Sequence, residues 1–307
     1  MIRQRYSTVL LLVAVVVAAM FVYSARVELI AAVSSASLSF AALTVIATLA
    51  LNLVVWFVFH ASVGNENTRT QTAKMFFGGQ VAKYLPGKVW GIVYQTTVKS
   101  SDVPVGYIIQ ANIVTYALTV LSTIFACVAL LVYPSSLPIA VVVIVTGAIL
   151  SVYLFSSDHL YRVIQQVSRL SKRFELTSNV PLIDFSISFR FAVYGLLVCF
   201  YVLSNLFLLF IFFEFSLEHA LQLTAYLGIA WLAGIVVAIT PSGLGVREVV
   251  FIALGSVTGT GSYELYASIA IVARTVQVLQ DLFFALIVPA AFGFLENKYE
   301  AGAQKTK

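Results

Sequence analysis

Charged residues flank two proline- and glycine-containing interruptions in an otherwise apolar chain. The first interruption reads Lys83-Tyr84-Leu85-Pro86-Gly87-Lys88-Val89-Trp90. Proline removes a backbone donor and glycine tolerates any φ, so we expect a helix to end here and to leave N–H groups free. Two ammonium groups beside free N–H groups and two amphipathic aromatic rings form a cradle suited to a phosphate. The alternative is an interfacial loop, whose lysines extend toward lipid headgroups and whose aromatic rings belong to the interface belt.

The second interruption reads Pro241-Ser242-Gly243-Leu244-Gly245 and is followed by Arg247 and Glu248. Its glycines allow a sharp turn, and a helix that begins near Val246 directs its first N–H groups at that turn. A charge inside an apolar segment costs about 2.5–3.5 kcal/mol or more when it is unpaired. Adjacent helical residues diverge, so Glu248 should meet a cation elsewhere, and the candidates are Lys83, Lys88 and Arg274. The alternative is a capped turn between two spans, with Arg247 among the headgroups.

A third group of polar residues lies inside the last apolar segment. Arg274, Gln277 and Asp281 recur at helical spacing, so they form one stripe that should face the interior of a bundle. They favour either a ligand path or a structural clamp between helices. Asn52, Asn112 and Asn205 are isolated polar residues in other apolar runs, and we expect them to form helix–helix hydrogen bonds.

The composition predicts an all-α, polytopic membrane helical bundle. The 307 residues are 61% hydrophobic and only 10% charged, with a mean hydropathy of +0.98, whereas soluble domains carry about a quarter charged residues. The net charge of +5 comes from residues in short loops, which favours anionic lipid surfaces and topology over nucleic acid. The histidines lack ligand spacing and no catalytic motif is present, so we expect no metal, no cofactor and no enzyme activity.

The apolar runs predict about eight transmembrane helices within one integral membrane domain of residues 1–307, including two Pro/Gly-broken or re-entrant segments. We expect parallel halves, 1–155 and 184–295, each with its interruption on the cytoplasmic side. A basic cytoplasmic connection, 156–183, joins them as a membrane-surface helix or a solvated loop. Val249–Thr258 is interpreted as a short or broken crossing. The excess of Lys and Arg in the expected inner loops then places both termini in the cytoplasm of a prokaryotic cell, with the chain in the inner membrane.

The two interruptions and the last apolar segment resemble the lysylphosphatidylglycerol synthase transmembrane-region family. This family comprises the eight-helix flippase part of the bacterial multiple peptide resistance factor and its stand-alone relatives. The resemblance rests on the sequences KYLPGKVWG, PSGLGVRE and ARTVQVLQD, and it covers the whole chain in layout. The matching residues are Tyr84, Leu85, Pro86, Gly87, Pro241, Gly243, Leu244, Gly245, Arg247, Glu248 and Arg274. Ser242 stands where the family pattern has a glycine.

This resemblance implies a lipid translocator, flippase-like, for a phospholipid or a lipid-linked glycan intermediate. Few residues follow the last apolar segment, so the aminoacyl-transfer chemistry of the full-length resistance factor is not expected on this chain. The alternative is a non-transporting membrane partner or anchor of an envelope glycosyltransferase. Expected partners are anionic or polyprenyl-linked lipids, a glycosyltransferase and a second copy of the chain. The predicted headgroup-binding residues are Lys83, Tyr84, Pro86, Gly87, Lys88, Trp90, Pro241, Gly243, Gly245, Arg247, Glu248, Arg274 and Asp281.

Overall fold

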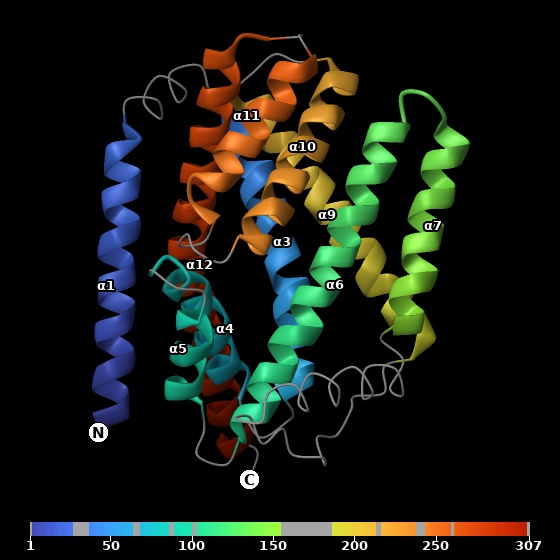
Figure 1. The fold of residues 1–307 in the computed structure, drawn as a ribbon. Coiled ribbons are helices and arrows are strands. Elements are labelled where there is room, and N and C mark those ends of the chain that lie inside the picture. The colour runs from blue at the N-terminus through green and yellow to red at the C-terminus, as the bar shows by residue number, and fades with distance from the viewer. Residues whose placement is uncertain are drawn as a thin grey trace, which may run out of the picture.

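A computed structural model shows that the chain folds into a bundle of α-helices (Figure 1). It describes residues 2–26, 37–63, 68–85, 89–99, 103–154, 186–212, 216–237, 243–258 and 261–305. Helices account for nearly all of these residues, and no strand occurs among them, so the predicted all-α class is confirmed. The helices within these ranges are α1 (Ile2–Ser24), α3 (Leu38–Val63), α4 (Arg69–Ala82), α5 (Trp90–Val98), α6 (Val105–Val132), α7 (Leu137–Leu154), α9 (Ile187–Phe212), α10 (Leu217–Val236), α11 (Val246–Thr258) and α12 (Tyr263–Lys305).

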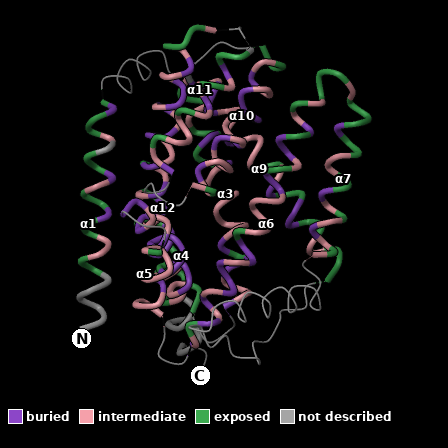
Figure 2. The backbone as a smooth tube through the Cα atoms, viewed as in Figure 1, coloured by how far each residue is buried: buried purple, intermediate pink, exposed green. Residues whose placement is uncertain are grey.

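Several of these helices are long and apolar enough to cross a membrane. Within the described ranges, six helices meet both criteria, namely α3, α6, α7, α9, α10 and most of α12. On α7, for example, only Ala140, Gly147 and Ser151 are buried, and large aliphatic side chains face outward on the rest of the helix (Figure 2). A helix that is apolar on every side needs an apolar solvent. The chain is therefore a multi-pass membrane protein.

The long helix α12 is the element along which both interrupted segments lie. The α4 backbone N–H of Thr70 donates to Glu296 Oε1 at 3.2 Å, and the Tyr84 hydroxyl, just past the end of α4, donates to Asp281 at 2.6 Å. Residue numbers thus rise along α4 as they fall along α12, so the two helices are antiparallel. The 14-residue α4 spans about 21 Å, too short for a bilayer core of about 30 Å. It therefore ends near the middle of α12.

The second interrupted segment reaches the same part of α12 from the opposite end. Arg247, in the first turn of α11, contacts Gln277, and Phe251 packs against Tyr266 with ring centroids 6.3 Å apart. Helix α11 is therefore also antiparallel to α12, but it lies along the N-terminal half of α12. Helices α4–α5 and α10–α11 form two hairpins whose turns approach each other midway along the bundle (Figure 1).

This arrangement differs from the expectation that both interruptions lie on the cytoplasmic side of parallel halves. Hairpins that enter from opposite ends are the geometry of an inverted arrangement. The physical reason is that α11 has only 13 residues, about 20 Å, so it returns from the middle of the bundle rather than crossing it. Helix α12 runs from one end of the bundle to the other, and α1 begins at the end where α12 finishes (Figure 1). The basic connection 156–183 lies outside the described residues.

The other long helices enclose the two hairpins. Helices α3 and α9 are antiparallel neighbours, because Ser37 bonds Ile211 at one end and the rings of Phe57 and Phe189 lie 5.7 Å apart at the other. Helix α1 covers the first hairpin, where Ala14 packs in a cluster with Val81, Leu85 and Trp90. Tyr84 and Leu85, at the turn of the first hairpin, are thus buried inside the bundle, at a depth where a charged group needs a partner or a polar cavity.

Candidate functional site

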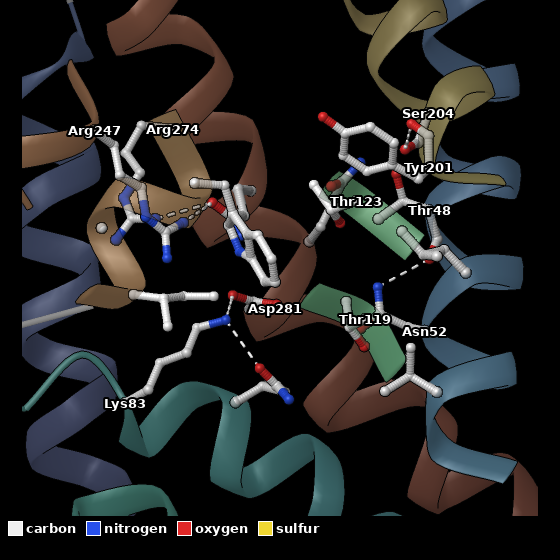
Figure 3. A pocket seen from close by; sticks show the side chains of 18 of the residues that line it. Thr48, Asn52, Lys83, Thr119, Thr123, Tyr201, Ser204, Arg247, Arg274 and Asp281 are labelled. Atoms are coloured by element: carbon white, nitrogen blue, oxygen red, sulfur yellow. Dashed lines mark hydrogen bonds and ion pairs between the residues drawn. The ribbon is translucent and has the colours of Figure 1, made fainter. Parts of the chain in front are cut away.

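A cavity of about 530 Å³ lies where the two hairpin turns face α12. Residues from α3, α5, α6, α9, α10, α11 and α12 and from the end of α4 line it, whereas α1 and α7 contribute none of its lining. The volume falls within the range of small-molecule sites, about 300–1,000 Å³. Figure 3 shows charged side chains on one side of the cavity and neutral polar side chains on the other.

The first hairpin contributes a lysine to the charged side, where it forms an ion pair with α12. Lys83, the residue after α4, places its Nζ 2.8 Å from Asp281 Oδ2, and Gln80 Oε1 accepts a second bond from Lys83 at 3.0 Å. The Tyr84 hydroxyl donates to the same Asp281 oxygen at 2.6 Å, from a side chain that is buried. Charge-assisted bonds of these lengths are strong. Asp281 therefore ties the turn of the first hairpin to the middle of α12.

The second hairpin contributes two further charges to the same side. Arg274 Nε lies 3.9 Å from Glu248 Oε1, so the cation predicted to meet Glu248 is Arg274. Arg274 also donates to Gln277 Oε1 at 2.9 Å, and Arg247 reaches that oxygen at 3.4 Å. The Arg274 guanidinium lies 5.5 Å from the centre of the Tyr84 ring, a cation–π distance that connects the first hairpin to α12. The predicted stripe on α12 is confirmed as a line of cavity residues.

Arg247 is the least satisfied cation of this group. Its single hydrogen bond is the long contact with Gln277, its Nε has no hydrogen-bond partner, and no described carboxylate lies within ion-pair distance of it. Buried polar groups are normally satisfied, so an exception of this kind requires an explanation. A free guanidinium that lines a cavity is suited to an anionic ligand.

The charges that line the cavity do not cancel. Among the described residues they are Lys83, Arg247, Arg274, Glu248 and Asp281, three cations and two carboxylates, which leaves one excess positive charge. At this depth an uncompensated charge is costly, so the cavity is electrostatically complementary to one negative charge.

Glycines set the position of Arg247 in the second hairpin. Gly243 and Gly245 have φ values of 74° and 82°, the left-handed region that glycine adopts without steric cost. They allow the turn that brings α11 back, and α11 begins at Val246 as predicted. A Cβ on Gly234 would lie 2.5 Å from Arg247 Nε and 2.6 Å from its Cγ. The missing side chain of Gly234 therefore provides the space in which Arg247 lies.

The structure brings together five of the predicted headgroup-binding residues and separates four others from the cavity. The five that line it are Lys83, Arg247, Glu248, Arg274 and Asp281. Tyr84 lies behind Asp281, Gly243 and Gly245 shape the turn, and Trp90 packs against the α1 cluster, so these four do not line the cavity. Pro86, Gly87, Lys88 and Pro241 lie outside the described residues.

The neutral side of the cavity was not predicted. Thr48, Asn52, Thr119, Thr123, Tyr201 and Ser204 line it from α3, α6 and α9 (Figure 3). Asn52 and Asn205 bond carbonyls of their own helices rather than other helices, and both line the cavity. Asn112 forms the expected contact between helices, with Gln95 Oε1 at 2.6 Å. The only sequence signal was that hydroxyl and amide residues recur within apolar runs.

Comparisons with known proteins add no assignment to this geometry. No protein-family model matches the chain, and neither a curated protein nor a solved structure is significantly similar to it. The resemblance to the lysylphosphatidylglycerol synthase transmembrane-region family thus stays a prediction.

Proposed function

We propose that this protein moves a lipid with an anionic headgroup across a cell membrane. The observation that carries the proposal is the cavity midway through the bundle, where the described residues leave one excess positive charge and offer Arg247 no carboxylate within ion-pair distance. Charged residues at this depth mark substrate paths in membrane proteins. A phosphodiester, the common element of anionic lipid headgroups, carries the single negative charge that the cavity lacks.

The two hairpins provide the moving parts of this mechanism. The first is tied to α12 through Lys83 and Asp281, and the second through Glu248 and Arg274. A phosphate that binds the cations competes with these carboxylates and so weakens both ties. Because the hairpins enter from opposite ends, the release of each one opens the cavity toward a different side of the membrane. Headgroup binding would then alternate access, while the acyl chains remain in the lipid.

Lipid movement in proteoliposomes tests this function. The purified protein is reconstituted with a tail-labelled anionic lipid, and the fraction of label accessible to a membrane-impermeant quencher is followed over time. We expect Arg247→Ala and Arg274→Ala to lower the rate at least about tenfold, because loss of a charge-assisted contact costs about 1.5–3 kcal/mol. The matched control is Arg26→Ala, since Arg26 contacts only Tyr23 at the end of α1 among the described residues, far from the cavity.

The same experiment separates transport from the role of a non-transporting partner or anchor. In that role the buried charges serve stability alone, so Arg247→Ala and Arg274→Ala would lower the folded yield. The rate of lipid movement would then equal that of protein-free liposomes for wild type and for every variant. Equal rates above that level for wild type and both variants would also refute the proposal, because the cavity charges would then play no part in movement.

A further inference from the structure

Many residues on the neutral side of the cavity share one hydrogen-bonding pattern, although the hydroxyls of Thr48 and Thr123 donate to no described residue. Six of its residues each donate to a backbone carbonyl of the helix to which they belong. We call these six the acceptor wall: Thr44, Asn52, Thr115, Thr119, Ser204 and Asn205. They come from α3, α6 and α9, and Figure 3 shows three of them, Asn52, Thr119 and Ser204, opposite the charged side.

These internal bonds determine what the wall offers to a ligand. Thr119 Oγ1 donates to the Thr115 carbonyl at 2.7 Å, which uses the only hydrogen of that hydroxyl. Asn52 Nδ2 lies 2.9 Å from the Thr48 carbonyl, and because a carbonyl only accepts, the amide oxygen must be the atom turned away from it. Each residue therefore retains oxygen lone pairs, and only the two asparagines also keep a second N–H, so these six residues mainly present acceptors.

The two sides of the cavity are thus chemically different. The charged side holds cations suited to a phosphate, and the acceptor wall suits a group that donates hydrogen bonds. That group is either an ammonium or a set of hydroxyls. An ammonium would cancel the negative charge of the phosphate and leave the excess positive charge of the cavity uncompensated. A headgroup with neutral hydroxyls suits both sides. Its hydroxyls donate to the acceptor wall, and its phosphodiester brings the single negative charge that the charged side lacks.

We propose that the substrate is a monoanionic lipid phosphodiester esterified to a neutral polyol, with the phosphate at the charged side and the hydroxyls against the acceptor wall. This inference rests on the proposed function and adds the substrate class to it. Two kinds of lipid share this chemistry: a glycerophospholipid with a glycerol headgroup and a polyprenyl phosphodiester of a sugar.

The test compares lipids that differ only in the headgroup. Phosphatidylglycerol is a monoanion with two hydroxyls, phosphatidylmethanol is a monoanion with none, and phosphatidylethanolamine is a zwitterion with an ammonium. Each is tail-labelled with the same chains and assayed in the proteoliposomes described above. We expect phosphatidylglycerol to move at least about tenfold faster than either of the other two, since a net hydrogen bond is worth about 0.5–1.5 kcal/mol.

A pair of matched variants places the effect at the wall. Thr119→Val removes a cavity oxygen, whereas Thr146→Val removes an equivalent hydroxyl that is bonded to Val142 at 2.8 Å on the exposed face of α7. Thr119→Val should lower the rate of phosphatidylglycerol movement about fivefold, because one hydrogen bond of about 1 kcal/mol is lost. The rate of phosphatidylmethanol movement should not change, because that headgroup has no hydroxyl. Thr146→Val should change neither rate.

The outcomes distinguish this inference from the proposed function. Equal rates for phosphatidylglycerol and phosphatidylmethanol in wild type would overturn the polyol inference and leave anionic-lipid transport standing.

If no lipid moves, the transport proposal fails, and thermal stabilisation of the detergent-solubilised protein by each lipid decides the inference instead. Greater stabilisation by phosphatidylglycerol than by phosphatidylmethanol, lost in Thr119→Val, supports the inference, and equal stabilisation overturns it. A polyprenyl phosphohexose in the same stability assay identifies the lipid-linked sugar as the source if it stabilises more strongly than phosphatidylglycerol.

Discussion

Removing the charge of Asp281 is expected to destabilise the attachment of the first hairpin to α12. One oxygen of Asp281 accepts from Lys83 Nζ at 2.8 Å and from the Tyr84 hydroxyl at 2.6 Å. In Asp281→Asn the Lys83 ammonium stays inside the bundle without a carboxylate, and breaking a buried pair in this way costs about 3–5 kcal/mol. The Lys83 side chain keeps 22% exposure toward the cavity, so we expect the lower end, about 3 kcal/mol in the free energy of unfolding.

A double variant separates the ion pair from packing. Lys83→Met combined with Asp281→Asn removes both charges, and replacing a buried pair by neutral groups is often close to neutral, so its stability should lie within about 1 kcal/mol of wild type. Unfolding in mixed detergent micelles, followed by tryptophan fluorescence, measures all variants. The reasoning is refuted if Asp281→Asn unfolds like wild type, or if the double variant is as unstable as Asp281→Asn. Glu264→Gln, an acid at the exposed start of α12, is the control and should show no comparable loss.

Two further predictions concern the second hairpin. Gly234→Ala should displace Arg247, because the added Cβ would lie 2.5 Å from its Nε, so lipid movement should fall as far as in Arg247→Ala. Gly195→Ala, where no atom lies within 4 Å of the added Cβ, is the matched control, and equal rates for the two alanine variants would contradict the packing. Leu244→Cys, in a background without native cysteines, should resist a membrane-impermeant thiol reagent applied from the side that labels Lys99→Cys, because the second turn lies midway along the bundle rather than at that end. Equal labelling of both positions would instead place the second turn on the same side of the membrane as Lys99, as the expectation of two cytoplasmic interruptions requires.

The convergence of the charges was predictable, because burying a charge has a clear cost. Glu248 next to Arg247 in an apolar run required a cation elsewhere, and the structure supplies Arg274 at 3.9 Å. Helical spacing likewise placed Arg274, Gln277 and Asp281 on one face. Such inferences succeed because an unpaired charge in an apolar segment is costly in any fold, so Arg, Lys, Glu and Asp in such segments must find a partner.

The direction of the second hairpin and the neutral wall were not predictable in the same way. Helix α10 has 20 residues, most of them apolar, and spans about 30 Å, so its composition does not distinguish a crossing helix from one arm of a hairpin. The position of its turn depends on contacts with α12, which hydropathy does not encode. Thr119 and Asn52 satisfy themselves within their own helices, so nothing in the sequence required a common cavity for them.

A structure determined in nanodiscs that contain an anionic phospholipid tests the central claim most directly. We predict phosphate density within hydrogen-bonding distance of Arg247 and Arg274, with the turns of both hairpins beside it at the middle of α12. Acyl-chain density alone in the cavity, or hairpin turns separated by apolar packing, would contradict the account.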